Sequence, residues 1–266
     1  MNEDRQIDIM GIVNITDDSY FSQSRCITVE HALSRISTLL GEGADIIDIG
    51  ACSTRPGAQL ISASEEWDRL EPVLGAIAAE YPGIRLSVDT FRSEIVRKSY
   101  DVIGPFMVND ISAGEDDPMM LQTVGELALD YVAMHKRGNP QTMASMTGYQ
   151  DVTEDVIRYF EEFAAKADKA GIREWILDPG FGFAKTIEQN YEILNNLDRL
   201  KSIGRRILIG VSRKSMIYKY LGISPEESLP ATQILHHYAL CKGADILRVH
   251  DVAEAVRTVS ISKMLS

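Results

Sequence analysis

The sequence has few cysteines and no hydrophobic run long enough to cross a membrane. Its three cysteines, Cys26, Cys52 and Cys241, form no CxxC pair, so they predict neither a disulfide framework nor a zinc motif. No segment approaches the ~18 consecutive apolar residues of a transmembrane helix, and the charged N-terminus lacks the apolar stretch of a signal peptide. We therefore expect a cytoplasmic protein in a reducing compartment.

Positive charge is also scarce. The chain carries 27 lysines and arginines against 39 aspartates and glutamates, which gives a net charge of −12. This balance argues against broad binding to nucleic acid or to anionic membranes. A negatively charged ligand would therefore have to be held by a local group of cations.

No segment is biased enough in composition to indicate disorder or a fibrous fold. Of the 266 residues, 45% are hydrophobic and 25% are charged, as in a globular protein with a sizeable core. No linker rich in proline, serine or glycine divides the chain, and no block of like charge does so. We expect a single domain that spans residues 1–266.

Short apolar runs alternate with longer amphipathic stretches along the whole chain, a pattern that predicts strands followed by helices. Eight such units would average about 33 residues, the size of a βα repeat. Gly43, Gly171 and Gly243 each precede a predicted strand and are typical of helix C-termini. The strands are expected near residues 7–13, 45–49, 84–88, 106–109, 130–134, 173–177, 207–211 and 245–249.

Two predicted helices have clear start signals. Asp151 and Glu154 have the spacing of a capping box before a helix over about 152–170. Ser62 and Glu65 have the same spacing at the start of the second helix, which Pro72 is expected to kink or split.

Polar residues follow every predicted strand. Two architectures fit the alternation, a closed (β/α)8 barrel or an open doubly wound sheet, and both bind ligands at the C-terminal ends of the strands. An open sheet needs function at one crevice only, so polar residues at all strand ends favour the TIM barrel. No GxGxxG follows the first strand and no GxxxxGK[ST] occurs, which weakens nucleotide-binding alternatives. The strand-end residues are Asn14, Asp48, Asp89, Asn109, Asp110, His135, Asp178, Ser212, Arg213, Lys214, His250 and Asp251.

Cations gather after the last two predicted strands. Arg213 and Lys214 precede a helix start, where free N–H groups favour an anion. Strand alternation places Arg248 and His250 on one side of the last strand, and the loops after strands 7 and 8 are the usual phosphate site of a barrel. The alternative is that these cations are solvated surface charges.

Carboxylates and amides from other strands complete the expected site. Asp89 and Asp178, with Asn109, suit a planar heterocycle that bears an amino group beside a ring N–H, as pterin and guanine do. The amide oxygen of Asn14 is a suitable Mg2+ ligand when substrate phosphates supply the other contacts. The alternatives are helix caps for the two aspartates and a turn role for Asn14. Arg55 adds one cation in a loop of small residues.

Several motifs together identify a family resemblance. The chain resembles the dihydropteroate synthase family, the pterin-binding barrel enzymes of folate biosynthesis, through essentially its whole length and in family order. The motifs are MGIVNIT (10–16), GADIIDIG (43–50), STRPG (53–57), SVDT (87–90), NDIS (109–112), MHKRG (134–138), LDPGFGF (177–183), GVSRKS (210–215) and RVHD (248–251).

The resemblance implies condensation of 6-hydroxymethyl-7,8-dihydropterin diphosphate with para-aminobenzoate, to give 7,8-dihydropteroate and pyrophosphate. It also implies Mg2+ as cofactor, small-molecule substrates and a homodimer. The residues that it implies for the pterin are Asp89, Asn109, Asp178 and Lys214. Those for the diphosphate and Mg2+ are Asn14, Arg248 and His250, with Thr54 and Arg55 on a loop, and Ser215 is implied for the carboxylate of para-aminobenzoate. The catalytic residues among these are Thr54, Arg55, Lys214, Arg248 and His250.

One segment departs from the family pattern, and two rival functions remain open. The first loop, residues 17–25, lacks the proline and the small Ser-Asp-Gly-Gly tail usual in the family. A corrinoid-linked methyltransferase shares the barrel but would not be expected to combine the motifs at 53–57, 212–215 and 248–250. A non-catalytic pterin-binding paralogue would be expected to lose cations such as Arg55 or Arg248, and both are present.

Overall fold

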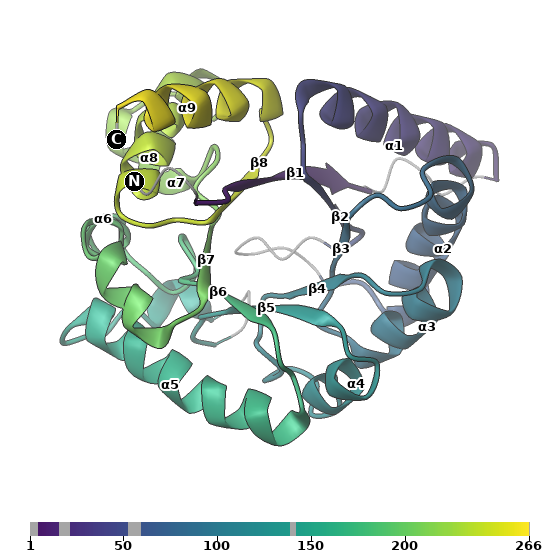
Figure 1. Ribbon diagram of the computed structural model, residues 1–266, viewed down its shortest axis with the longest axis horizontal. Coiled ribbons are helices and arrows are strands. Elements are labelled where there is room, and N and C mark those ends of the chain that lie inside the picture. The colour runs from purple at the N-terminus through teal and green to yellow at the C-terminus, as the bar shows by residue number, and fades with distance from the viewer. Residues whose placement is uncertain (1–4, 16–21, 53–59, 139–141, 266) are drawn as a thin grey trace.

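Eight parallel strands form a closed barrel, and each strand pairs with its sequence neighbour until β8 returns to β1. The computed structural model describes residues 5–15, 22–52, 60–138 and 142–265 (Figure 1). The strands are β1 (Asp8–Asn14), β2 (Ile46–Gly50), β3 (Leu86–Asp89), β4 (Met107–Asp110), β5 (Asp130–Met134), β6 (Trp175–Asp178), β7 (Arg206–Ile209) and β8 (Ile246–Val249). The expected TIM barrel is confirmed, with each predicted strand found within two residues of its predicted ends.

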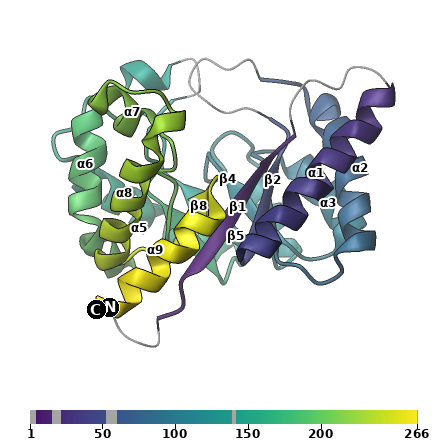
Figure 2. The same ribbon diagram turned by 90° about the horizontal axis from the view of Figure 1, so that it is seen from above.

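Helices surround the barrel and cover the outer face of the strands (Figure 1). Figure 2 shows the barrel from the side, with β1 running between α1 and α9. The α-helices are α1 (Ser22–Glu42), α2 (Ala63–Glu80), α3 (Ser93–Ile103), α4 (Met120–Glu126), α5 (Val152–Ala170), α6 (Ile187–Asn195), α7 (Ser215–Leu221), α8 (Leu229–Cys241) and α9 (Val252–Met264). Short 3-10 helices cover Met143–Ser145, Leu197–Ile203 and Glu226–Ser228. None of the helices in the described ranges is long and apolar enough to span a membrane.

Both predicted helix starts are found, but only one of the two capping boxes is complete. Asp151 accepts a hydrogen bond from the Glu154 N–H at 2.9 Å, but the Glu154 carboxylate pairs with Arg199, so the predicted box is half formed. The capping box of Ser62 and Glu65 is complete.

Pro72, which is predicted to kink or split the second helix, does not split it: α2 runs through the proline as one helix. Its apolar face is buried on both sides of the proline through Leu70, Val73, Leu74 and Ile77. Burying such side chains is worth about 1.5–3 kcal/mol each, which together exceeds the ~3 kcal/mol cost of an internal proline.

A small apolar cluster fills the barrel interior, apart from the larger core between strands and helices. It consists of Met10, Ile46, Met107, Val132, Ile176, Leu208 and Ile246. Because strand side chains alternate with a period of two, the residues two positions further along face the same interior, nearer the C-terminal mouth. On β2, β4, β6 and β8 these are Asp48, Asn109, Asp178 and Arg248. The apolar plug therefore forms the floor beneath a polar layer.

The strand register brings the ends of neighbouring strands to one level. Asn14 lies opposite Gly50, Gly50 opposite Asp89, and Asp89 opposite Asn109. Gly50 relieves crowding at this level, since a Cβ there would lie 3.1 Å from the Cβ of Asp89, closer than most such contacts. The backbone of β2 thus makes room for the Asp89 side chain at the mouth.

Candidate functional site

Arg248 is the central cation of the polar layer. Its Nε donates to Oδ2 of Asp48 at 2.7 Å, and its Nη2 donates to Oδ2 of Asp89 at 2.8 Å. The Arg248 side chain is 22% exposed, that of Asp89 13% and that of Asp48 0%. Three charges on β2, β3 and β8 are therefore joined across the barrel mouth, where only the arginine and Asp89 reach solvent.

Asn109 extends this network to β4. Its Nδ2 lies 3.3 Å from Oδ1 and 3.2 Å from Oδ2 of Asp48, and its side chain is buried. Asp48 thus accepts from both Arg248 and Asn109, and it holds two residues that the family resemblance assigns to substrate. The sequence marks Asp48 only as a polar strand end. Its place two residues beyond the interior Ile46 is the signal that identifies it as a member of the layer.

Burial and the charge of Arg248 have opposite effects on the pKa of Asp89 at the mouth. Burial raises the pKa of Asp89 to about 7, against the opposing effect of the Arg248 charge. Burial alone would lower the pKa of Arg248, but the carboxylates of Asp48 and Asp89 raise it above its usual value. Arg248 is therefore a permanent cation, and Asp89 changes charge near neutral pH.

Asp178 and Lys214 form a second charged group at the mouth, next to β6 and β7. Oδ1 of Asp178 accepts a hydrogen bond from the Gly180 N–H at 2.8 Å. Burial raises the pKa of Asp178, and the charge of Lys214 is the largest effect that opposes it. Lys214 donates to the Phe181 carbonyl at 2.5 Å and lies 4.9 Å from the ring centroid of Phe183. Burial lowers the pKa of Lys214 to about 8, so it too changes charge close to neutral pH.

Two further predicted residues after β7 and β8, His250 and Arg213, differ in orientation. His250 lies beside Ser212, with Nδ1 and Oγ 3.0 Å apart. Arg213, at a φ of 54°, pairs with both carboxylate oxygens of Asp251 at 2.8 and 2.9 Å. Arg213 is thus held by Asp251, and the prediction that Arg213 and Lys214 together supply two cations to a ligand stays a prediction. Ser215 is the first residue of α7 and is half-buried beside Lys214.

Three predicted site residues lie at the edge of the described chain or outside it. Asn14 is the exposed last residue of β1, level with the end of β2. Thr54 and Arg55 lie outside the described residues, as do positions 17–21 of the first loop.

A buried lysine near Asp178 has no counterpart among the sequence predictions. Nζ of Lys185 lies 3.0 Å from Nδ1 of His135 and 2.9 Å from the Gly180 carbonyl. Burial lowers the pKa of Lys185 to about 7, with the charge of Asp178 opposing this. Lys185 follows the strand end by seven residues, so strand alternation could not indicate where its side chain points.

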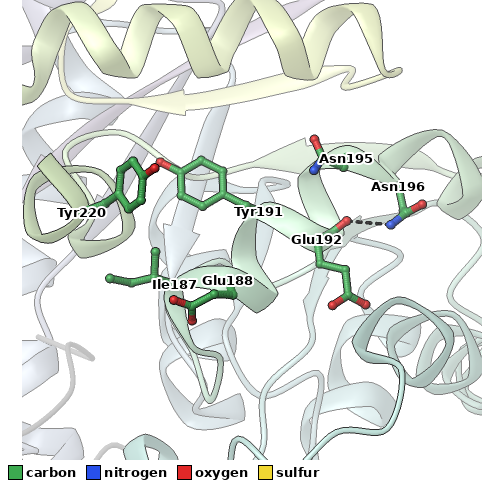
Figure 3. A pocket seen from close by; sticks show the side chains of 7 residues that line it. All are labelled: Ile187, Glu188, Tyr191, Glu192, Asn195, Asn196 and Tyr220. Atoms are coloured by element: carbon green, nitrogen blue, oxygen red, sulfur yellow. Dashed lines mark hydrogen bonds between the residues drawn. The ribbon is translucent and has the colours of Figure 1, made fainter.

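A groove of about 530 Å³ lies outside the barrel mouth, between α6 and α7 (Figure 3). It is lined by Ile187, Glu188, Tyr191, Glu192, Asn195, Asn196 and Tyr220. None of these residues belongs to the polar layer. The ligand site of a barrel enzyme is expected where strand ends converge and where charged groups have perturbed pKa values. The mouth formed by Asp48, Asp89, Asn109, Asp178, Lys214 and Arg248 meets both criteria, so we assign the functional site there.

Comparison with known proteins shows the family to which the chain is similar. A family of pterin-binding enzymes matches residues 10–250. A dihydropteroate synthase of Escherichia coli K12 is 39% identical over 255 residues, which cover 95% of this chain and 89% of that protein. The crystal structure of a Yersinia pestis dihydropteroate synthase with a sulfonamide drug covers 100% of this chain and 96% of that one, with a TM-score of 0.91 and 34% identity.

A second solved structure carries a reaction product. A Xanthomonas albilineans dihydropteroate synthase in complex with 7,8-dihydropteroate has a TM-score of 0.85 and 35% identity, and the match covers 100% of this chain and 95% of that one.

The Arg248 network generates a stability prediction. Arg248→Met leaves Asp48 and Asp89 without their cation, which should lower the free energy of unfolding by about 3–5 kcal/mol near pH 8. Without the cation, the folded-state pKa of Asp89, which burial already raises, rises further above its unfolded value of about 3.9. A carboxylate with a raised pKa destabilises the fold at high pH, and this cost fades as pH falls and the group takes up a proton.

The deficit of Arg248→Met should therefore shrink between about pH 8 and pH 5, as measured by urea unfolding at both values. Arg257→Met is the control, because Arg257 is exposed and pairs only with Glu254 on its own helix in the part of the chain described. It should change stability by less than about 1 kcal/mol. An equal deficit of Arg248→Met at both pH values would contradict the network.

Proposed function

This chain belongs to the dihydropteroate synthase family of pterin-binding enzymes, and from that membership we propose how its residues carry out the reaction. The enzyme condenses 6-hydroxymethyl-7,8-dihydropterin diphosphate with para-aminobenzoate, and the products are 7,8-dihydropteroate and pyrophosphate. The observation that carries the residue assignment is the barrel mouth, where Asn109, Asp178 and Arg248 of the polar layer lie with Asp89 and Lys214.

Asp178 recognises the pterin in this proposal. An ionised carboxylate accepts two hydrogen bonds at once, which matches the amino group and the adjacent ring N–H of a pterin. The Gly180 N–H already fixes one oxygen of Asp178, and the charge of Lys214 favours its ionised form. Asp89 and Asn109 meet the other polar edge of the ring, and Lys214 donates to a ring acceptor.

The diphosphate lies toward Arg248 and His250. Within the described residues, Arg248 uses Nε and Nη2 to hold the aspartates, which leaves its Nη1 group for a diphosphate oxygen. Thr54 and Arg55, which lie outside those residues, are proposed to contact the same group. As the bond between the methylene carbon and the diphosphate oxygen breaks, negative charge grows on the leaving group, and fixed cations stabilise it.

Asn14 fits a Mg2+ site that is shared with the substrate. Its amide oxygen is the kind of hard ligand that Mg2+ prefers, and its position at the exposed end of β1 borders the mouth. No group of three or more His, Cys, Asp or Glu side chains in the described part of the chain could hold a metal by itself. The diphosphate and water would supply the other ligands. Bound there, Mg2+ would neutralise charge on the diphosphate.

Para-aminobenzoate completes the reaction from the α7 side. Ser215 is proposed to donate a hydrogen bond to its carboxylate from the start of this helix. The aromatic amine then attacks the methylene carbon, a C–N bond forms, and the amine nitrogen loses a proton. Because the amine is only weakly basic, the reaction depends on stabilising the departing pyrophosphate.

A cytoplasmic homodimer is part of the proposal. Apolar side chains are exposed on α8 and α9, which pack side by side (Figure 1). They include Ile234, Tyr238, Ile261, Met264 and Leu265. Such a patch is typical of an interaction surface and supports self-association. The low cysteine content supports a reducing compartment.

Turnover tests the proposal against a pterin-binding protein that does not catalyse. The purified chain, given 6-hydroxymethyl-7,8-dihydropterin diphosphate, Mg2+ and labelled para-aminobenzoate, should form labelled 7,8-dihydropteroate. Chelation of Mg2+ with EDTA should abolish product formation, and added Mg2+ should restore it. Pterin binding without product would support the non-catalytic alternative, whereas full activity in EDTA would remove the metal from the proposal.

Asp178→Asn tests the pterin contact. The substitution replaces a buried charge-assisted pair by a mismatched neutral one, which costs about 2–5 kcal/mol of binding free energy. Calorimetry with the pterin diphosphate in the absence of para-aminobenzoate measures this loss. Asp168→Asn is the control, because Asp168 is exposed on α5. Unchanged affinity in Asp178→Asn would exclude Asp178 from the site.

A further inference from the structure

Lys185 is a buried cation whose donors are all used by the protein. It is 9% exposed, and its Nζ makes contacts of 3.0 Å with Nδ1 of His135, 2.9 Å with the Gly180 carbonyl and 3.1 Å with the Phe183 carbonyl. A lysine ammonium has three donors, and three acceptors surround it here. A longer contact of 3.5 Å reaches the His135 carbonyl. Lys185 therefore has no donor left for a substrate. In this respect it differs from Lys214, which is proposed to donate to the pterin.

His135 acts as an acceptor in this arrangement. Burial lowers the pKa of His135 well below its usual value, and the charge of Lys185 adds to this effect. A neutral imidazole has one ring nitrogen that accepts, and Nδ1 faces the lysine. The His135 backbone also donates to the Asp178 carbonyl at 2.9 Å. The end of β5 is thus bonded both to Lys185 and to the end of β6.

Gly180 connects Lys185 to Asp178. The carbonyl of Gly180 accepts from Lys185, and its N–H donates to the Asp178 carboxylate. Gly180 has a φ of +72°, and a Cβ there would lie 1.9 Å from the His135 carbonyl oxygen. This close approach of two backbone segments leaves little room for the residue to shift. Two hydrogen bonds therefore separate the Lys185 ammonium from the carboxylate proposed to bind pterin.

The same segment also holds Lys214. Phe181, between the two glycines of the segment, accepts from Lys214 through its carbonyl, and the Phe183 ring lies under the Lys214 ammonium. Lys185 in turn bonds the carbonyl of Phe183. Residues 178–183 are thus bonded to Lys185 through two carbonyls, and the same segment includes Asp178 and contacts Lys214.

We propose that Lys185 is a positioning residue for pterin recognition, which fixes the 178–183 segment so that Asp178 and Lys214 are preorganised at the barrel mouth. The inference rests on the proposed function, because it concerns the pterin contacts assigned there. Preorganisation of this kind raises affinity because the free protein already holds the bound geometry.

Lys185→Met tests the proposal, since methionine keeps an unbranched side chain and removes all three donors. Affinity for 6-hydroxymethyl-7,8-dihydropterin diphosphate, measured by calorimetry without para-aminobenzoate, should fall by about 10- to 100-fold, as when partners that orient metal ligands are removed. The KM for para-aminobenzoate at saturating pterin diphosphate should change less than about twofold, since Ser215 has no contact with the segment among the hydrogen bonds of the described chain.

Lys136→Met is the matched control. Lys136 is a second buried lysine, 3% exposed, in the loop after β5, and its Nζ bonds Asp116 at 2.6 and 2.8 Å and the Gly138 carbonyl at 3.1 Å. Lys136→Met therefore also removes a buried ammonium, with a similar cost in stability, but Lys136 forms no hydrogen bond with residues 178–183 in the described chain. Pterin affinity should stay within about twofold of the unsubstituted protein, even where thermal stability falls.

A pH profile separates positioning from a general loss of packing. Asp178 faces Lys214 from α7, Arg248 from β8 and Lys185 from its own loop, and all three cations lower its pKa against the effect of burial. Removing Lys185 should therefore raise the pKa of Asp178. The loss of pterin affinity on acidification should then begin at a higher pH in Lys185→Met than in the unsubstituted protein, and stay unmoved in Lys136→Met.

The outcomes distinguish this inference from the proposed function. If the unsubstituted protein binds no pterin diphosphate, both fail. Suppose that the unsubstituted protein binds pterin diphosphate and that Asp178→Asn weakens this binding. If Lys185→Met then binds pterin diphosphate as tightly as the unsubstituted protein, only the positioning role is overturned. An equal loss in Lys136→Met would also overturn it. Should Lys185→Met not fold, Lys185→Gln, which keeps a donor and removes the charge, provides the same comparison.

Discussion

The barrel mouth depends on the ion pairs of Arg248 with Asp48 and Asp89. A cation and two carboxylates on three different strands can meet only when the barrel is closed and its register is correct, because β8 reaches β2 and β3 across the interior. Each ion would be costly to bury alone, so the three groups stabilise one another in place. The apolar plug beneath them keeps the layer at the C-terminal edge.

Electrostatics links this network to chemistry. The chain has a net charge of −12, yet its functional site concentrates Arg248, Lys214 and His250 at one edge. Asp48, Asp89 and Asp178 lie beside the cations Arg248 and Lys214, so the mouth can remain folded without a ligand. In the proposed function, the anionic diphosphate lies toward Arg248 and His250. This arrangement suits a reaction whose main requirement is stabilisation of a departing pyrophosphate.

The strand positions could be predicted from the sequence, because they follow from the alternation of apolar and polar segments. The residues at the mouth could be predicted because they follow the strand ends and occur in family motifs. Partners could not. Arg213 and Arg248 both follow or end late strands, but the positive φ of Arg213 turns it to Asp251, while Arg248 points into the barrel. The sequence marks Asp48 only as a polar strand end and gives no sign of Lys185, because their contacts with Arg248 and His135 join residues distant in sequence. Thr54 and Arg55 lie outside the described residues, so their roles stay predictions.

The central claim is that the polar layer at the barrel mouth binds the pterin. A crystal structure of this chain with 7,8-dihydropteroate tests it most directly. The account predicts the pterin ring within hydrogen-bond distance of Asp178 and Asn109, with Lys214 beside it and Arg248 still paired with Asp48. Product bound elsewhere, for example in the groove between α6 and α7, with the layer empty, would contradict it.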